Sequence, residues 1–439
     1  MTGLAALRAR KFQLLMVGFL LFFLWTGEAF AQPQLMAGAS VRNITPDPLL
    51  PVSGGIGTPK PAQEKRGDLF VRAMVLVKGD VKIAIVGIDN LGWPSVLGDK
   101  ARALIDHIPA ENVLIGATHT HSAPDAYGFP DEEGNHHADL SYLEFCTQQI
   151  AEAVNEAYSR LQPADLKIAM GEAKGKIAFN YYAEDLYDPR CGVIQAKVKG
   201  TDQTIATLVN YAIHPEVMGS KRGVLSPDLC GPLYERIESQ AGGVAIFMNG
   251  ALGGMVTADN RHETIKSSDG VPNDLMWSEC VRIGNLLADE ALRIVSQAKP
   301  LLNPQLQSVS KMVDFPVGSP IMQYILANSP LSYISASPNQ VSTRVNALQI
   351  GPARILTIPG EALPNVGYYL KRNMDTQFPF LFGLTNDAFG YMMAKVDYDS
   401  FRKYDYITRT SLGEMTAEIY MKEALELVGK LRVEVGMEE

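Results

Sequence analysis

The stretch Asn112-Val-Leu-Ile-Gly-Ala-Thr-His119-Thr-His121-Ser-Ala-Pro124 begins as a short apolar run and ends in two histidines and a proline. The apolar run predicts a buried β-strand over residues 112–117. Two imidazoles two residues apart on an extended chain point to the same side. Neutral imidazole is a common zinc ligand and a common acid/base group, so the stretch favours a functional site at the end of a strand. A pair of hydrogen-bonded structural histidines is the alternative.

Short apolar runs and longer amphipathic stretches alternate on both sides of this segment. The other β-rich runs are residues 69–77, 81–88, 205–211, 244–248, 345–350 and 354–358. Apolar residues recur at intervals of three and four, as in helices, over residues 96–105, 140–161, 275–296 and 412–431. Strands interleaved with helices predict an α/β fold, with mixed β-sheets packed by helices and functional residues at strand ends.

The length and composition suit one large globular domain. The chain has 439 residues, of which 46% are hydrophobic and 20% charged. Without a flexible linker or an internal repeat, residues 32–439 are expected to form one domain of two lobes, with a soft boundary near residue 300. The formal net charge of −9 has the wrong sign for a nucleic-acid partner.

The first 31 residues have the pattern of a secretory signal peptide. Three basic residues precede the apolar run at residues 12–25, and Ala29-Phe30-Ala31 supplies small residues before a cleavage site after Ala31. A retained membrane anchor is the alternative, but a span needs about twenty apolar residues. The mature protein is therefore expected to be periplasmic or secreted.

The four cysteines, Cys146, Cys191, Cys230 and Cys280, are scattered without CxxC spacing. This spacing gives no support for a zinc knuckle or a thioredoxin-like site. In an exported protein the four residues can form two disulfides or remain buried thiols, and the sequence leaves both open.

Three further segments present functional side chains after strand-like or Gly-rich runs. Residues 207–213 lead into His214-Pro215, residues 355–360 lead into Glu361, and a Gly-rich turn after Asn386 presents Tyr391. Each segment is a weak signal alone, because a histidine, an acid or a tyrosine at a turn usually has a local structural role.

Together these segments resemble the neutral/alkaline (non-lysosomal) ceramidase family. The resemblance rests on motifs in the family's order and spans roughly residues 37–431. The motifs are Thr118-His119-Thr120-His121-Ser122-Ala123-Pro124, Tyr211-Ala-Ile-His214-Pro215, Pro359-Gly360-Glu361 and the tyrosine-bearing segment from Asn386 to Tyr398.

The resemblance implies one catalytic Zn²⁺ per chain, held by His119, His214, Glu361 and Tyr391. Two imidazoles, a carboxylate and a phenolic oxygen suit zinc and leave room for water or substrate. The same resemblance gives His121 the role of general acid/base in amide hydrolysis. Asp89 and Asp228 are candidate carboxylates behind a metal-bound imidazole, although turn or cap roles fit them equally well.

The sequence also departs from the family pattern. Val256 stands where the family has a serine in a Gly-rich loop, and Thr257 could take that place only after a shift that reverses its direction. Tyr181 follows Asn180 where the family commonly has arginine. The chain is expected to lack the family's C-terminal immunoglobulin-like domain.

The expected protein is thus an exported zinc hydrolase that cleaves an N-acyl amide by zinc-activated water. Its expected partner is a small-molecule or lipid amide, with transient membrane-surface contact left open and neither a nucleic-acid nor a protein partner expected. The departures leave the substrate open between ceramide, as in sphingolipid metabolism, and another N-acyl compound. Two alternatives remain, a zinc hydrolase for a different amide or ester, and a non-catalytic periplasmic protein that binds zinc or a ligand.

Overall fold

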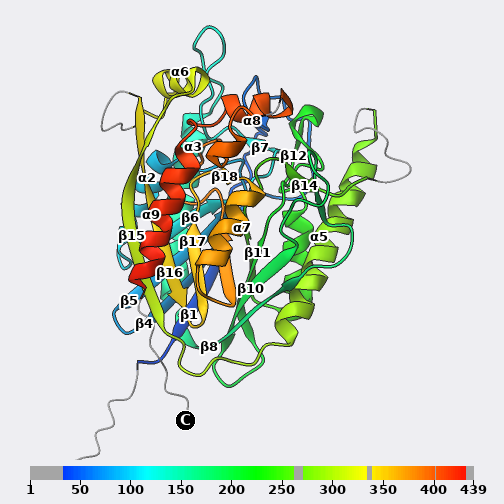
Figure 1. The fold of residues 1–439 in the computed structure, drawn as a ribbon. Coiled ribbons are helices and arrows are strands. Elements are labelled where there is room, and N and C mark those ends of the chain that lie inside the picture. The colour runs from blue at the N-terminus through cyan, green and yellow to red at the C-terminus, as the bar shows by residue number, and fades with distance from the viewer. Residues whose placement is uncertain (1–32, 262–269, 334–338, 401, 432–439) are drawn as a thin grey trace, which may run out of the picture. The chain divides into compact units, whose positions relative to one another are not determined.

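Two stacked β-sheets with helices on their outer faces form the core of the computed structural model (Figure 1). The structure describes residues 33–261, 270–333, 339–400 and 402–431. Contacts group the residues from Leu35 onward into one compact unit. The predicted signal peptide lies outside the described residues. Across those ranges, every helix is too short or too polar to cross a membrane.

The larger sheet has eight strands in the order β13-β11-β10-β8-β1-β4-β5-β6. Its pairs are antiparallel except at the two ends, where β5 runs parallel to β6 and β11 parallel to β13. Helices cross over between these parallel strands, as parallel pairing requires. The strands are β1 Met36–Asn43, β4 Phe70–Lys78, β5 Val81–Ile88, β6 Val113–Ala117, β8 Gln162–Glu172, β10 Arg190–Val198, β11 Thr204–Tyr211 and β13 Val244–Asn249.

The smaller sheet has four strands in the order β15-β16-β17-β19. The strands are β15 Leu306–Pro316, β16 Gln340–Ile350, β17 Ala353–Thr357 and β19 Phe378–Phe382, and only β17 and β19 are parallel. The remaining pieces form two-stranded ladders: β2 Val52–Ser53 with β7 Ala123–Pro124, β3 Glu64–Lys65 with β12 Val224–Leu225, β9 Ala178–Asn180 with β14 Val256–Ala258, and β18 Glu361–Ala362 with β20 Tyr391–Met392.

Successive side chains of a strand point to opposite faces of the larger sheet, and this divides the hydrophobic core into layers. In β4, Val71, Ala73 and Val75 face the helices, whereas Met74 and Leu76 face the smaller sheet. Helices α2, α3, α4 and α5 cover the outer face of the larger sheet, and α7 and α9 cover the outer face of the smaller one. The result is a four-layered helix–sheet–sheet–helix arrangement. The helices are α2 Ser95–Arg102, α3 Leu140–Ser159, α4 Cys230–Ala241, α5 Asn273–Ser296, α6 Pro320–Asn328, α7 Pro364–Asn373, α8 Asp405–Arg409 and α9 Thr416–Lys430.

The two edge strands of the larger sheet, β6 and β13, pack against each other although six strands separate them in the sheet order. A glycine in β6 permits this approach: a Cβ at Gly116 would lie 2.6 Å from Cε of Met248 in β13. The carboxyl ends of β6, β11 and β13 are thereby gathered in one place. Loops beyond the carboxyl ends of parallel strands are common ligand sites.

The predicted fold class is confirmed, because mixed sheets are packed by helices. All seven predicted strands and four predicted helices exist, with ends shifted by a few residues. Strands β1, β8, β10, β15 and β19 and helices α4, α6, α7 and α8 were not predicted. Of the two alternatives for the four cysteines, disulfides or buried thiols, the structure has the second, because all four are buried free thiols.

Candidate metal site

His119 follows β6 in a loop that continues the pairing with the segment after β5. Thr118 N donates to Ile88 O at 2.9 Å and His119 N donates to Asn90 O at 2.9 Å. His119 has φ of 72°, a conformation that is uncommon for a residue with a side chain and that is often found at functional sites. Its ring lies 2.5 Å, Nδ1 to O, from the carbonyl of Leu91. A carbonyl can only accept, so Nδ1 carries the proton and Nε2 keeps its lone pair.

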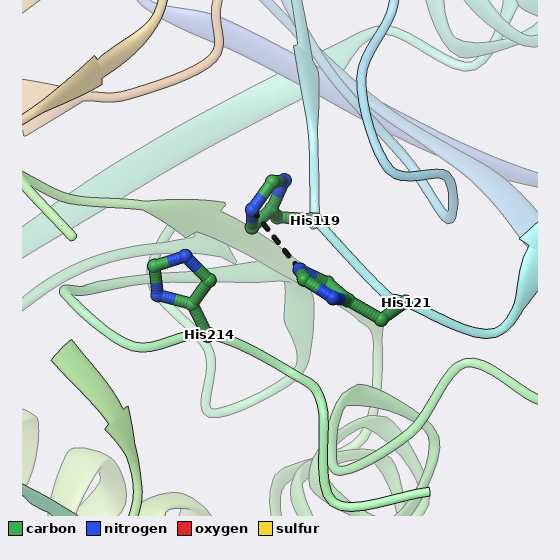
Figure 2. A group of neighbouring side chains, drawn as sticks. All are labelled: His119, His121 and His214. Atoms are coloured by element: carbon green, nitrogen blue, oxygen red, sulfur yellow. Dashed lines mark hydrogen bonds between the residues drawn. The ribbon is translucent and has the colours of Figure 1, made fainter. Parts of the chain in front are cut away.

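His214 reaches the same place from the end of β11. Its backbone N–H and its ring Nδ1–H both donate to Val256 O, each at 2.8 Å. The side chain is fully buried. Nε2 of His214 therefore also keeps its lone pair and faces the loop that carries His119 (Figure 2).

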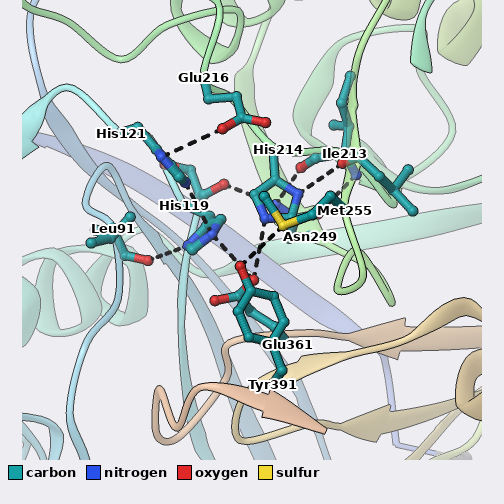
Figure 3. Close-up of polar contacts among 12 residues, drawn as sticks. Leu91, His119, His121, Ile213, His214, Glu216, Asn249, Met255, Glu361 and Tyr391 are labelled. Atoms are coloured by element: carbon teal, nitrogen blue, oxygen red, sulfur yellow. Dashed lines mark hydrogen bonds and ion pairs between the residues drawn. The ribbon is translucent and has the colours of Figure 1, made fainter. Parts of the chain in front are cut away.

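Glu361 and Tyr391 come from the other side of the molecule, on paired strands. β18 and β20 are parallel, and Glu361 is the register partner of Tyr391. Oε2 of Glu361 lies 3.2 Å from Nε2 of His214 and 3.7 Å from Nε2 of His119. The Tyr391 hydroxyl lies beside the Glu361 carboxylate and donates to Sδ of Met255 at 3.1 Å (Figure 3).

His121 lies on the opposite side of His119 from Glu361. Its Nε2 is 3.2 Å from Nε2 of His119, and its Nδ1 is 3.6 Å from Oε2 of Glu216 (Figures 2 and 3). Glu216 is two residues beyond His214, and no sequence signal identified it. The available signal was its position in His214-Pro215-Glu216, because residues in a turn beside a candidate ligand lie near the same site.

The donors at this point fit a metal ion. One nitrogen from each of His119, His121 and His214 lies within 4.8 Å of the other two. The carboxylate of Glu361 forms a second set with His119 and His214. Ligand atoms about 2.1 Å from a tetrahedral zinc are roughly 3.4 Å apart, close to the separations of 3.2 and 3.7 Å from Glu361. His119 and His214 belong to both sets.

Burial and the neighbouring charged groups together set the ionisation of the cluster. Burial lowers the pKa of His119 and of His121 to about 3. Burial alone would raise the pKa of Glu361, but His119 and His214 outweigh it and hold that pKa below its usual value. Burial likewise opposes charge on His214, but Glu361 and Glu216 raise its pKa. Deprotonated carboxylate and neutral imidazoles are the forms that bind metals.

A cavity of about 770 Å³ opens beside the cluster. His119, His121, Glu361 and Tyr391 form its polar wall. The rest is largely apolar, with side chains from the loop after β2, the loop before α3, α6 and the segment before α9: Ile56, Phe129, Met322, Ile325, Leu326 and Leu412. Largely apolar pockets with a few convergent polar groups are typical of small-molecule sites.

Asp89 and Asp228, the candidate carboxylates behind a metal-bound imidazole, accept hydrogen bonds from backbone N–H groups. Asp89 accepts from Phe70 N at 2.9 Å and from the Tyr234 hydroxyl at 3.1 Å. Asp228 accepts from Met218 N and Leu229 N at 2.7 and 2.8 Å. For His119 and His214, the two candidate ligand imidazoles, the Nδ1 partner is instead a backbone carbonyl. Sequence patterns do not reveal such partners, because every residue has a carbonyl.

The two segments that depart from the family pattern lie next to each other. β9 and β14 pair so that Val256 is opposite Asn180, and Tyr181 N donates to Met255 O at 2.9 Å. The Val256 side chain is buried in the core, and its carbonyl holds His214. Tyr181 is 70% exposed. Both altered segments thus contribute to one rim of the cluster.

No protein-family model matches the sequence, and no curated protein matches it. Solved structures do match in fold. Neutral ceramidase from Pseudomonas aeruginosa has a TM-score of 0.72 and 16% identity, over 90% of this chain and 74% of that one. A ceramidase complexed with C2 has a TM-score of 0.69 and 16% identity, over 90% of this chain and 75% of that one. The chain therefore has the fold of the neutral ceramidases.

Proposed function

We propose that the chain is a zinc-dependent hydrolase that cleaves an N-acyl amide bond. One observation carries the proposal: Nε2 of His119, Nε2 of His214 and Oε2 of Glu361 converge at the wall of a largely apolar cavity. In the proposal these residues and Tyr391 hold one Zn²⁺. The fold shared with neutral ceramidases supports an amide as the substrate.

Bound zinc would supply a Lewis acid for the amide carbonyl and a water of lowered pKa. The chain supplies the rest. His121 would accept the proton of the attacking water at Nε2 and return it to the leaving amine nitrogen. The carboxylate of Glu216, 3.6 Å from Nδ1 of His121, would stabilise the imidazolium in between. The Leu91 and Val256 carbonyls keep both ligand imidazoles oriented.

The apolar wall favours a substrate with a hydrocarbon arm. Apolar side chains from separate elements line one cavity, so an acyl chain placed there would leave water while its amide lies against the polar wall. Val256 offers no hydroxyl, so the proposed mechanism uses none from that loop.

A different amide or an ester is the second candidate substrate. It is favoured by the two altered segments, because Tyr181 N donates to Met255 O, and Met255 and Val256 in turn contact Tyr391 and His214. Export, with cleavage after Ala31, belongs to the proposal, and mass spectrometry of the mature N-terminus tests it.

The test combines metal content with turnover. The mature chain is expected to hold about one zinc, and His214→Ala is expected to lose zinc and activity together. His121→Gln should keep the zinc while turnover falls by roughly 10²- to 10⁴-fold, as for a lost general acid/base. Elemental analysis and hydrolysis of N-acyl lipids, N-acyl sugars and esters provide the measurements.

Each failure has its own meaning. Zinc retained by His214→Ala would refute the ligand set, and zinc lost from His121→Gln would make His121 a ligand instead. Zinc binding without turnover of any substrate in the panel would favour the non-catalytic binding protein.

A further inference from the structure

Asn249, the last residue of β13, uses its whole side-chain amide in hydrogen bonds. Nδ2 donates to Thr118 O at 2.9 Å and to Ile213 O at 2.8 Å. Oδ1 accepts from Ile213 N at 3.2 Å and from Gly250 N at 3.0 Å. The residue is fully buried, and an asparagine amide has two donors and two principal acceptor sites.

Three of these four hydrogen bonds join Asn249 to the residues directly before two proposed metal ligands. Thr118 precedes His119 in the sequence, and Ile213 precedes His214. Figure 3 shows Asn249 beside Ile213 and His214. A single planar amide thus connects the two histidine-bearing loops at the residues before the histidines. The loops are linked a second time after the histidine positions 119 and 214, where His121 N donates to Pro215 O at 3.1 Å.

The sheet alone does not fix the distance between these loops. His119 follows β6, the edge strand at one end of the eight-stranded sheet, whereas His214 follows β11 near the other end. No ladder of strand hydrogen bonds joins the edges β6 and β13 among the described residues. Hydrogen bonds of the Asn249 side chain join the two loops at the point where the packed strands β6 and β13 end.

The same residue also reaches toward the third ligand. Its backbone carbonyl accepts from Gly383 N at 2.9 Å, and Leu384 N donates to Gly360 O, next to Glu361, at 3.2 Å. This third link is made by the main chain of Asn249 and does not involve its side-chain amide.

We infer that Asn249 is a positioning residue that sets the separation of His119 and His214 and so preorganises the metal site. It touches neither metal nor substrate. Buried groups that orient ligands typically change metal affinity by about 10- to 100-fold when they are removed. The inference rests on the proposed metal site and adds a residue that the motif comparison gave no role.

Asn210 is a matched control. It is also a buried asparagine, and its Nδ2 donates to three carbonyls, those of Met248, Asn249 and Leu381, at 2.8 to 3.0 Å. Its side chain contacts Asn249 only at the backbone carbonyl and has no hydrogen bond to the histidine-bearing loops. Truncation of either asparagine leaves buried carbonyls unpaired, so the cost to folding should be similar.

The experiment measures Zn²⁺ affinity by competition with a chromophoric chelator for the mature chain, Asn249→Ala and Asn210→Ala. Urea unfolding of the zinc-free proteins measures the folding cost. Asn249→Ala is expected to weaken Zn²⁺ binding about 10- to 100-fold and to alter the visible spectrum of the Co²⁺-loaded protein. Asn210→Ala should lose similar stability but keep both the affinity and the spectrum. If the alanine variants do not fold, the milder pair Asn249→Ser and Asn210→Ser is compared in the same way.

Equal Zn²⁺ affinity in the two variants, or an unchanged Co²⁺ spectrum for the variant at position 249, would overturn the positioning role while the metal site stands. Failure of the unmodified chain to bind Zn²⁺ would instead refute the metal site, and the role of Asn249 with it.

Discussion

At residue 253 the chain has no room for a side chain. Gly253 N donates to Ala362 O at 2.9 Å, and a Cβ at this position would lie 2.2 Å from Glu361 O. Real Cβ atoms do not approach a backbone oxygen so closely, so any side chain must displace the loop or β18. Gly253 thus lets the segment that holds His214 lie directly against the strand that carries Glu361.

We expect Gly253→Ala to destabilise the chain by about 1–3 kcal/mol, as overpacking does, and to weaken Zn²⁺ binding because Glu361 shifts. Gly429→Ala is the control, since Gly429 lies in α9 with open space around it and alanine is the better helix former by up to about 1 kcal/mol. Urea unfolding and chelator competition measure both effects. A normal Zn²⁺ affinity in Gly253→Ala would contradict the argument.

At the scale of elements, a buried ion pair fastens α7 to the segment before β10. Lys371 Nζ lies 2.7 Å from Oδ2 of Asp188, and Arg190 Nε lies 2.7 Å from Oδ1 of the same carboxylate. Burial would raise the pKa of Asp188, but Lys371 and Arg190 outweigh it and lower that pKa below 3.8. The pair therefore stabilises the fold above the unfolded pKa, and this contribution is lost as the pH falls through the folded pKa.

Lys371→Met is expected to destabilise the protein by about 3–5 kcal/mol at pH 7, because a buried carboxylate loses one of its cations. The difference from the unmodified chain should shrink below about pH 4, where Asp188 takes up a proton in the unfolded state. Urea unfolding at pH 7 and below about pH 4 measures this difference in the free energy of unfolding. Lys197→Met, in the pair with the exposed Asp202, should cost less than about 1 kcal/mol. A loss for Lys371→Met that is equal at both pH values would show that packing, not charge, holds α7.

Three of the strands that the sequence did not predict, β8, β10 and β15, contain polar residues among their apolar ones. β15 alternates polar and apolar residues and is only partly buried, and β8 and β10 contain Lys, Arg, Asp or Glu among their apolar residues. Their pairing with neighbouring strands, rather than their own hydrophobicity, makes them strands. β19, Phe378–Phe382, is apolar throughout but has a proline at its second position, and it was not predicted either.

At the scale of the whole molecule, the proposed metal would join the two sheets. His119 and His214 follow strands of the eight-stranded sheet, whereas Glu361 follows β17 of the four-stranded sheet and pairs with the strand of Tyr391. An ion held by both sets would bind the folded chain and not the unfolded one. It would then stabilise the fold as a whole by mass action.

Free Zn²⁺ at one hundred times its dissociation constant should raise the free energy of unfolding by about 2.7 kcal/mol. Removal with a chelator should reverse the gain. Thermal or urea unfolding of the mature chain checks this, and His119→Ala, which lacks a ligand, should show no gain. An equal gain in His119→Ala would mean that Zn²⁺ binds elsewhere.

The sequence by itself predicted the fold class, and its resemblance to a known family implied the candidate ligands. The apolar run that ends before His119-Thr-His121 was a signal alone, whereas His214, Glu361 and Tyr391 became candidates only through the resemblance. Tertiary structure decided which of them meet, and which groups hold them. The carbonyls of Leu91 and Val256, the carboxylate of Glu216 and the amide of Asn249 are distant in sequence from at least one partner. The pairing of β5 with β6 and of β11 with β13 places each carbonyl beside its histidine, and the packing of β6 against β13, which no local pattern encodes, brings the two histidines together.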